Sequence, residues 1–328
     1  MMTNNSLSCV KEASEYLLTL DNIIIFTHER PDGDAIGSVF ALQKALKRSG
    51  KMADVYFSES LSARDSALIN ENTYISKRRA NHDYSVCIAL DCGNFERLET
   101  FDKRKMLNIP ILNIDHHQDN TLFGARNFVD SKACATAEII FDILLAGKNE
   151  ITGDIANCLL MGIMLDTGGL RFDNTNANVL RKVATLVDLG AEYNLIVKNI
   201  YFTKPLGVMT LESDVILAHT KIACNGKFAY AYLSEKLLDK HKTKYKDTEG
   251  TIDYIRTIDG LIITAILSKN KDGFRVSLRS NNANYPVSTI AKEMSGGGHK
   301  LAAGCTINVN TIEEAEKILL EKVSSILK

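Results

Sequence analysis

Short apolar runs alternate with amphipathic stretches through the first part of the chain. Four runs have the length and composition of buried strands: 22–26, 53–57, 85–90 and 110–114. The amphipathic pattern from Ala35 to Arg48 predicts a helix between the first two runs. Strands that alternate with helices favour a parallel sheet covered by helices on its faces. Because ligands of such sheets bind just beyond the carboxyl ends of the strands, the residues that follow each run are the first candidates for chemistry.

The pattern becomes helical from about Asp130 to Leu189, including an apolar helix over Ile155–Leu165, and Gly190 is typical of a helix end. Residues 193–213 have no clear period and contain a proline and a glycine, so we expect an inter-domain linker there. Strand-like runs then return at 228–232, 261–267 and 274–278. We therefore expect an α/β protein in three parts: a parallel-sheet domain with flanking helices over 1–192, the linker over 193–213, and a smaller α/β domain over 214–328.

The composition narrows the class of protein. The length of 328 residues suits two domains, and 39 Lys plus Arg against 40 Asp plus Glu leave a net charge of −1. A protein that coats long nucleic acid usually carries a basic surplus, and this chain has none. No apolar run approaches the roughly 20 residues of a membrane span. The absence of a leader pattern at the start, and seven cysteines without a Cys-x-x-Cys pair, lead us to expect a cytoplasmic protein with no membrane partner.

Asp and His side chains gather in four segments that each follow a predicted strand or helix. The segments are Thr27–Asp34, Asp91, Asp115–His117 and Asp166–Gly169. Each alone is weak, since an Asp-Gly pair is usually a turn and a lone His is more often a core or surface residue. Together they place several carboxylates at one edge of the sheet, where they would repel one another unless cations neutralise them.

Two divalent ions would neutralise four converging carboxylates, those of Asp32, Asp34, Asp91 and Asp166. If His28 and His116 join them and Asp91 bridges, the ions receive three and four protein ligands and keep open positions for water and a phosphate oxygen. That layout suits two-metal hydrolysis of a phosphoester. Oxygen and imidazole ligands without a thiolate favour Mn2+ over Mg2+, Co2+ or Zn2+.

Three neighbouring side chains need separate roles. Asp115 is expected to orient a histidine, because a metal-bound imidazole usually donates its second N–H to a carboxylate. His117 would contact the scissile phosphate or protonate the leaving oxygen; the alternative is a hydrogen-bonded loop residue. Cys92 would be a soft ligand beside Asp91, but alternation along the strand should turn it to the opposite face.

The second domain offers a different chemistry. Three consecutive glycines, Gly296, Gly297 and Gly298, follow a helix predicted over 287–294 and can present backbone N–H groups to an anion. Arg279 and His299 would add charged donors. The alternatives are a helix cap with a turn and a solvated surface arginine. We expect this domain to hold a substrate rather than transform it.

These motifs resemble those of the DHH phosphoesterase family. The matching segments, in chain order, are Thr27-His28…Pro31-Asp-Gly-Asp-Ala-Ile-Gly-Ser38, Ala89-Leu-Asp91…Glu96-Arg97-Leu98, Asn113-Ile-Asp-His-His117…Asn120 and Gly162-Ile…Asp166-Thr-Gly-Gly169. Gly296-Gly-Gly-His299…Ala302-Ala-Gly304 is similar to the signature of the associated DHHA1 domain. The resemblance covers nearly the whole chain, although residues 213–258 show no motif that we align. It is closest to the stand-alone nano-RNase type, also described as bifunctional oligoribonuclease and 3′-phosphoadenosine 5′-phosphate (pAp) phosphatase.

The resemblance implies a role for each candidate residue. A first metal would sit on His28, Asp32 and Asp91, and a second on Asp34, Asp91, His116 and Asp166. His117 would face the scissile phosphate, while Arg279 and the Gly296–His299 loop would hold the far end of the substrate. The active site would lie in a cleft between the two domains. Preference for Mn2+ and pairing into homodimers are likewise implied by the resemblance.

The function expected on these grounds is metal-dependent hydrolysis of very short single-stranded RNA to 5′-mononucleotides, with pAp phosphatase activity beside it. Phosphodiesterase action on c-di-AMP or its linear product pApA is an alternative that the same site could perform. A DHH inorganic pyrophosphatase shares the metal motifs but would not need the glycine loop, and an exonuclease of the RecJ type would be longer. A non-catalytic nucleotide- or RNA-binding protein is the alternative of another class; it would be expected to lose metal ligands, and here all six positions are filled.

Overall fold

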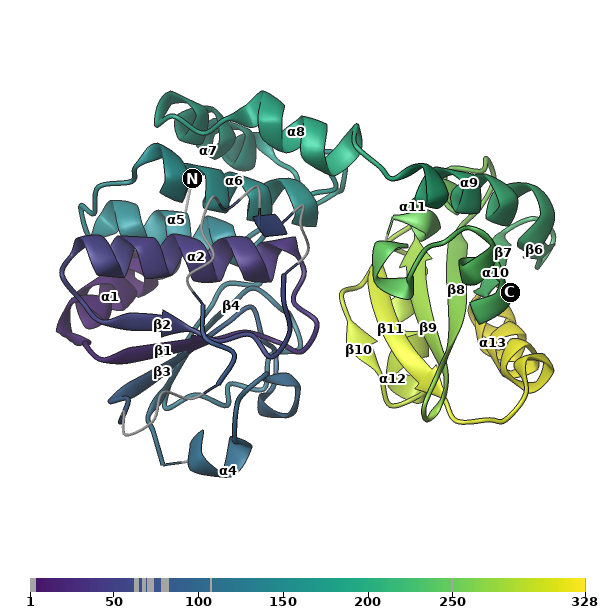
Figure 1. Ribbon diagram of the computed structural model, residues 1–328, viewed down its shortest axis with the longest axis horizontal. Helices are drawn as coiled ribbons and strands as arrows, with labels where there is room; N and C mark the ends of the chain where they lie inside the picture. Colours follow the sequence, from purple (N-terminus) through teal and green to yellow (C-terminus); the bar gives the residue numbers. More distant parts are fainter. Residues whose placement is uncertain are drawn as a thin grey trace. The chain divides into compact units, whose positions relative to one another are not determined.

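The computed structural model divides the chain into two compact units, Met1–Thr203 and Lys204–Lys328 (Figure 1). The structure describes residues 4–61, 65, 66, 69, 74–77, 83–106, 108–248 and 250–327. The division falls within the stretch 193–213 where we expected a linker, but most of that stretch is helical. It forms α8 (Tyr193–Tyr201) in the first unit and α9 (Leu206–Asp214) in the second. Pro205, which we took as a linker signal, precedes the first turn of α9, where its missing N–H costs nothing.

The first unit is built on a parallel sheet, as expected. Its strand order is β2-β1-β3-β4-β5 and every pairing is parallel. The strands are β1 (Ile23–Phe26), β2 (Ala53–Val55), β3 (Val86–Leu90), β4 (Ile111–Asp115) and β5 (Arg126–Val129). The sequence did not predict β5, because only Phe128 of this edge strand is buried and its composition is not apolar.

Helices cover one face of this sheet and shorter elements cover the other (Figure 1). The helices are α1 (Asn4–Thr19), α2 (Gly33–Arg48), α5 (Thr136–Ala146), α6 (Gly153–Asp166) and α7 (Ala177–Asp188). Ile23 and Ile25 pack against this layer, whereas Ile24 and Phe26 pack on the opposite face with Leu98. That second face is bordered by the 3-10 turn η1 (Phe95–Arg97) and by α4 (Lys103–Met106). Burial on both faces explains why the strands read as continuous apolar runs.

Glycines let α2 and α6 approach closely at the end that carries the candidate ligands. A Cβ at Gly37 would lie 2.4 Å from the carbonyl oxygen of Cys158. A Cβ at Gly162 would lie 2.7 Å from Oδ1 of Asp34. These absent side chains therefore allow the first turn of α2 to meet the last turns of α6, which ends at Asp166.

The second unit is a smaller α/β domain, also as expected. Its sheet has the order β10-β11-β9-β8-β7-β6; the β7–β8 pairing is parallel and the others are antiparallel. The strands are β6 (Thr220–Ala223), β7 (Phe228–Leu233), β8 (Ile263–Asn270), β9 (Gly273–Ser280), β10 (Gly297–Gly298) and β11 (Ala302–Ile307). The sequence predicted β7, β8 and β9, whose residues are mostly buried, but not the short or glycine-rich strands.

Helices lie against both faces of the second sheet. One face packs on α12 (Val287–Glu293) and α13 (Ile312–Ile326). The other packs on α9, on the π-helical turn η2 (Val215–His219), on α10 (Glu235–Lys240) and on α11 (Thr251–Ile255). A 3-10 turn, η3 (Tyr245–Asp247), precedes α11. None of the helices that the structure describes is both long and apolar enough to cross a membrane.

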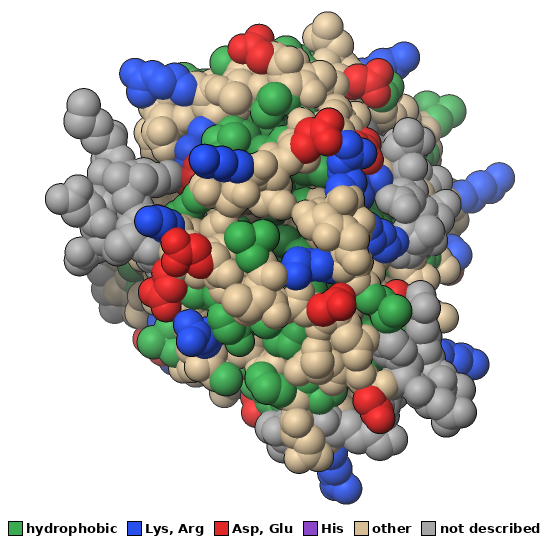
Figure 2. All heavy atoms as spheres, turned by 90° about the vertical axis from the view of Figure 1, so that its left-hand side faces the viewer, with side chains coloured by type: hydrophobic (Ala, Val, Ile, Leu, Met, Phe, Trp, Pro, Cys, Tyr) green, Lys and Arg blue, Asp and Glu red, His purple; other side chains and the backbone are tan. Residues whose placement is uncertain are grey.

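The surface in Figure 2 carries Lys and Arg side chains interspersed with Asp and Glu. Small hydrophobic groups lie between them, and neither sign of charge forms a continuous field among the described residues of this face. Proteins bind long nucleic acids through a continuous positively charged surface, and the described residues of this face do not form one.

Candidate metal centre

The loop after β1 supplies the first two candidate ligands. Asp32 is the N-cap of α2, and its Oδ1 accepts two backbone N–H groups of the first turn at 3.1 Å each. Its other oxygen, Oδ2, lies 3.9 Å from Nε2 of His28. Nδ1 of His28 lies 2.9 Å from the carbonyl oxygen of Glu29. A proton on Nδ1 donated to that carbonyl leaves Nε2 with its lone pair free to bind a cation.

Asp91 stands at the centre of the arrangement. It follows β3 in a left-handed backbone conformation, with φ of 54°, and its side chain is buried. Oδ2 lies 3.7 Å from Nε2 of His28, and Oδ1 lies 3.6 Å from Nε2 of His116. The hydroxyl of Thr136 donates to Oδ1 at 2.9 Å. One carboxylate thus turns its two oxygens toward two different imidazoles, which is the geometry of a bridging ligand.

His116 brings the remaining carboxylates together. Its Nε2 lies 3.9 Å from Oδ2 of Asp34 and 3.6 Å from Oδ2 of Asp166. Its Nδ1 faces the carbonyl oxygen of Ala133 at 3.3 Å, so a backbone carbonyl orients this ring as it does that of His28. Separations of 3.6–3.9 Å exceed hydrogen-bond lengths, which means that these side chains face a shared space rather than one another.

The structure therefore brings all six predicted metal positions to one edge of the sheet. The ligand atoms of His28, Asp32 and Asp91 lie within 4.8 Å of one another, and so do those of Asp34, Asp91 and His116. Asp166 joins the second group through its contact with His116. The two groups share Asp91.

The protonation of these carboxyl groups fits a site for cations. Burial raises the pKa of Asp34 to about 7, and the neighbouring Asp91 adds to the shift. Burial likewise raises the pKa of Asp166 to about 7, and it raises that of Asp91. Asp32 differs because its side chain is 58% exposed: desolvation opposes its charge, but His28 and the N–H of Ala35 outweigh that effect and lower the pKa. Buried oxygen and imidazole donors that repel one another without a counter-charge are a donor set suited to divalent metal ions.

The metal-free protein should lose thermal stability as pH rises from 6 to 8. Asp34 and Asp166 bind protons more tightly when folded, with pKa values near 7 against 3.8 for an exposed Asp, so the folded state is favoured at the lower pH. Mn2+ at about a hundred times its Kd at pH 6 should raise Tm there by roughly 5–10 °C, and the same concentration should raise it more at pH 8, where fewer protons compete for the ligands. Thermal melts with EDTA or MnCl2 at each pH measure this. A metal-free Tm that rises between pH 6 and 8 would contradict the site electrostatics.

His117 is fixed by a carboxylate and carries a charge. Its Nδ1 lies 2.7 Å from Oδ1 of the fully buried Asp115. Burial opposes the charge on His117, but Asp115 outweighs it and raises the pKa to about 10. In return, hydrogen bonds from His117 and Asn120 overcome burial and hold the pKa of Asp115 at about 2. Asp115 therefore orients the ring of His117, and the same Oδ1 also accepts the backbone N–H of His116 at 2.8 Å.

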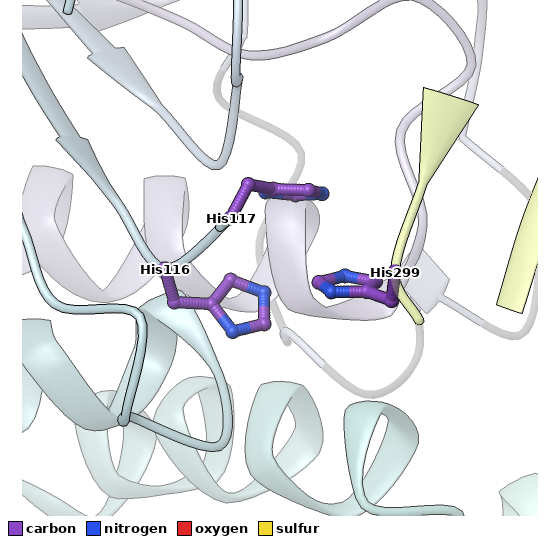
Figure 3. A group of neighbouring side chains, drawn as sticks. All are labelled: His116, His117 and His299. Atoms are coloured by element: carbon purple, nitrogen blue, oxygen red, sulfur yellow. The ribbon is translucent and has the colours of Figure 1, made fainter. Parts of the chain in front are cut away.

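His116 and His117 come from the same strand end, as Figure 3 shows. Both follow β4, and their ring centroids lie 5.0 Å apart in an edge-to-face arrangement. One ring is held by a backbone carbonyl and the other by a carboxylate. The two rings are therefore oriented through different partners, although nearby carboxylates raise the pKa of His116 as well as that of His117.

Three supporting residues received no role from the sequence, although Asn113 and Asn120 belong to one of the matching segments. Asn113, in the middle of β4, donates to the carbonyl oxygens of residues 89 and 92 and accepts from Asn120 at 2.8 Å. Asn120 also donates to Oδ2 of Asp115 at 2.6 Å. A polar residue inside an apolar strand was the available signal for Asn113. Thr136 had no signal, since its role depends on a helix start far away in the sequence.

Cys92 lies on the other face of the sheet, as strand alternation predicted. It packs with Ile24 and Phe26, and its thiol donates to the carbonyl oxygen of Asn94 at 3.1 Å. Burial raises the pKa of this thiol to about 12, so it is not a thiolate at neutral pH.

The predicted substrate residues of the second unit gather at one end of its sheet. Arg279 is near the end of β9 and pairs in register with Ala302, which starts β11 just after His299. The N–H of Gly296 bonds the carbonyl oxygen of Ala291 at 2.8 Å, so this glycine caps α12. A role for this end of the sheet in binding stays a prediction.

Two of the glycines are needed to form that end of the sheet. Gly297 and Gly298 form β10, which pairs with β11. Gly298 has φ of 130°, and a Cβ there would lie 2.7 Å from the carbonyl oxygen of Ala302. Gly298 is therefore required by backbone geometry, whether or not the run also binds a ligand.

Comparison with known proteins gives two family matches. Residues 22–163 match the DHH family, N-terminal domain, and residues 225–328 match the DHHA1 domain. The first match spans β1 to α6 and contains five of the six candidate ligands. The sixth, Asp166, follows three residues after its end.

Curated relatives match over most of their length. The chain is 31% identical over 305 residues to the bifunctional oligoribonuclease and PAP phosphatase NrnA of Thermus thermophilus, covering 92% of this chain and 89% of that protein. It is 26% identical to the protein of the same name from Bacillus subtilis, covering 92% and 93%. Among solved structures, an exopolyphosphatase-related protein from Bacteroides fragilis superposes with a TM-score of 0.87 at 22% identity, covering 98% and 96%, which shows a shared fold.

Proposed function

The chain belongs to the DHH family and carries a DHHA1 domain, and from this premise we propose that it degrades very short oligoribonucleotides to 5′-mononucleotides and also dephosphorylates pAp. It is a hydrolase that acts on phosphoester bonds. The observation that carries the proposal is the pair of ligand groups that share Asp91. Relatives named oligoribonuclease and PAP phosphatase match it over nearly their whole length, which favours this substrate class over cyclic dinucleotides.

Two divalent ions, with Mn2+ as the favoured metal, are proposed to bind at this centre. His28, Asp32 and Asp91 would hold one ion; the other would be held by Asp34, Asp91, His116 and Asp166. When bound, the ions would activate water and offset negative charge at phosphorus. The protein's own contribution is a set of carboxylates, with Asp34 and Asp91 buried, that already face one another and need little reorganisation.

His117 is proposed to act on the substrate rather than on the metals. A charged imidazole donates a strong hydrogen bond to a phosphate oxygen and can pass a proton to the leaving oxygen. Asp115 keeps the ring in one orientation through Nδ1, which leaves Nε2 for the substrate. Asn120 donates a hydrogen bond to Asp115, and Asn113 in turn accepts one from Asn120, so both asparagines help to hold the carboxylate in place.

The second domain is proposed to bind the part of the nucleotide that does not react. Arg279, His299 and the Gly296–Gly298 run would contact a terminal phosphate. One phosphate clamp and one reaction centre select short substrates and require no extended basic surface, in keeping with the net charge of −1. Pairing into homodimers and a cytoplasmic location belong to the same proposal.

Turnover of a 5′-labelled RNA ladder tests the proposal. With RNAs from two to about twenty-four nucleotides in Mn2+, we expect rapid loss of only the shortest, because a single clamp cannot order a long strand. Parallel reactions with pAp, c-di-AMP, pApA and pyrophosphate rank the alternatives. If the protein prefers c-di-AMP or pyrophosphate, that compound is its substrate instead. If it turns over none of these compounds, it is a nucleotide-binding protein without catalytic activity.

Arg279→Ala should raise KM for a dinucleotide about 10- to 100-fold with kcat changed less. Loss of a charge-assisted hydrogen bond to phosphate removes roughly 1.5–3 kcal/mol of binding, and each 1.4 kcal/mol is tenfold. Arg275→Ala is the matched control, since this arginine lies four residues earlier on the same strand. Equal KM values for the two variants would show that Arg279 does not bind the substrate.

A further inference from the structure

The turn that begins α5 contacts three of the candidate metal ligands directly and is linked to a fourth through one side chain. Its N–H groups at Thr136 and Ala137 donate to the two oxygens of Asp34 at 2.6 Å and 2.9 Å. The Thr136 hydroxyl donates to Asp91, and the Ala133 carbonyl faces His116. A displacement of this turn would therefore move several ligands at once.

The fourth ligand, Asp166, is linked to the turn by Asn174, which lies in the loop between α6 and α7. Asn174 donates to the carbonyl oxygens of Cys134 and Asp166, at 3.0 Å and 3.1 Å. The end of α6, which carries Asp166, is thereby tied to the same turn. The turn is the common support of ligands that come from four separate elements.

The buried carboxylate of Glu138 forms a hydrogen bond to the backbone of this turn. Oε2 of Glu138 accepts the backbone N–H of Cys134 at 2.7 Å. Glu138 lies three residues after Ala135, the N-cap of α5, so its side chain reaches back over the helix start as in a capping box. Its side chain is only 6% exposed, which leaves little room for water to replace it.

Glu138 is itself held by α7. Its Oε1 accepts from Nζ of Lys182 at 2.7 Å and from Nδ2 of Asn178 at 3.2 Å. Lys182 also donates to Oδ2 of Asp142 at 2.6 Å and is buried. Burial opposes ionisation of Glu138, but Lys182 outweighs it and keeps the pKa low, whereas burial raises the pKa of Asp142 to about 6. Lys182 thus pairs with both carboxylates and ties Glu138 to α7.

Stability alone is a weak reason for this ion network. Taking a Lys and a carboxylate out of water costs about as much as their attraction returns, and apolar groups of similar size often stabilise as well. What an apolar group cannot do is accept the Cys134 N–H and fix the position of the turn. Groups behind metal ligands commonly change metal affinity about 10- to 100-fold.

We propose that Glu138, held by Lys182 and Asn178, is a positioning residue of the metal centre, which sets the affinity for divalent ions through the Ala133–Ala137 turn. The inference rests on the proposed function, because it concerns the same centre. Glu138 contacts neither a metal ligand nor the substrate. The role of its buried ion network is then to support metal binding.

Direct titration with Mn2+, followed by the EPR signal of the free ion, tests this without relying on activity. Glu138→Ala should weaken Mn2+ binding about 10- to 100-fold. Glu138→Gln keeps an oxygen for the Cys134 N–H and should stay within about fivefold of wild type. Lys44→Met is the matched control, since Lys44 is also a buried lysine with a carboxylate partner, Asp154 at 3.2 Å, and lies ten residues along α2 from Asp34.

The control separates positioning from stability. Lys44→Met should lower Tm and leave the Kd for Mn2+ within about twofold. A Glu138→Ala protein that also keeps its Mn2+ affinity within twofold would overturn the inference. If that variant does not fold, Asn178→Ala takes its place: roughly three- to tenfold weaker binding supports the inference and a change under twofold overturns it.

The wild-type titration distinguishes this inference from the proposed function. If wild type binds Mn2+ and Asp91→Ala does not, the metal centre stands, and only the Glu138 variants decide the inference. If wild type and Asp91→Ala bind Mn2+ equally, the proposed centre fails and the inference fails with it.

Discussion

Asp91→Ala should lower turnover of a dinucleotide at least about a thousandfold while the protein stays folded. The side chain turns one oxygen toward His28 and the other toward His116, so its removal affects both ligand groups together. Metal ions at phosphoester centres supply several kcal/mol of charge stabilisation, and each 1.4 kcal/mol is tenfold in rate. Steady-state kinetics with saturating Mn2+ measure the loss, and circular dichroism checks the fold.

Asp188→Ala is the control for this substitution, because Asp188 is an exposed aspartate at the end of α7. It should match wild type. An Asp91→Ala protein within tenfold of wild-type turnover would show that the shared carboxylate is not part of the reaction centre.

Asp115→Asn should lower kcat about 100- to 10,000-fold, the range that a positioned acid contributes, with Mn2+ affinity largely kept. The pKa of His117 is raised to about 10 mainly by the hydrogen-bonded Asp115 carboxylate, with Asp91 adding to the shift. Without that negative charge the pKa of His117 falls toward its ordinary value near 6.5, so the charged form is lost as pH rises. The remaining activity should therefore decline from about pH 7 upward, earlier than in wild type.

The pH profile separates this role from a purely structural one. His117→Ala should lose activity to a similar extent but show no such alkaline decline, because the titrating group is gone. If Asp115→Asn and wild type have the same alkaline limb, the charge on His117 does not depend on Asp115 and the assigned role is wrong.

The sequence predicted the parts of the fold that are fixed by local pattern. The apolar runs at β1, β3 and β4 are buried on both faces, and this burial is what makes a strand recognisable from its residues alone. The parallel order then follows from the alternation with helices, and it places the strand ends at one edge. His28, Asp91 and His116 were found because each directly follows such a strand.

The missed features depend on contacts that a local pattern does not carry. The edge strand β5 has one buried residue, and β10 consists of two glycines, so neither has an apolar signal. α8 and α9 were obscured by Pro205 between them, which starts a helix here rather than ending one. Thr136 and Glu138 act through backbone groups of a turn that the fold brings to the site from about 100 residues away in the sequence.

Asp91 is proposed to share its carboxylate between two divalent ions. Anomalous diffraction at the manganese edge, from crystals of the protein grown with Mn2+, locates the ions directly. We expect two peaks, one among His28, Asp32 and Asp91 and the other among Asp34, Asp91, His116 and Asp166. A single peak, or peaks that do not contact Asp91, would contradict this proposal.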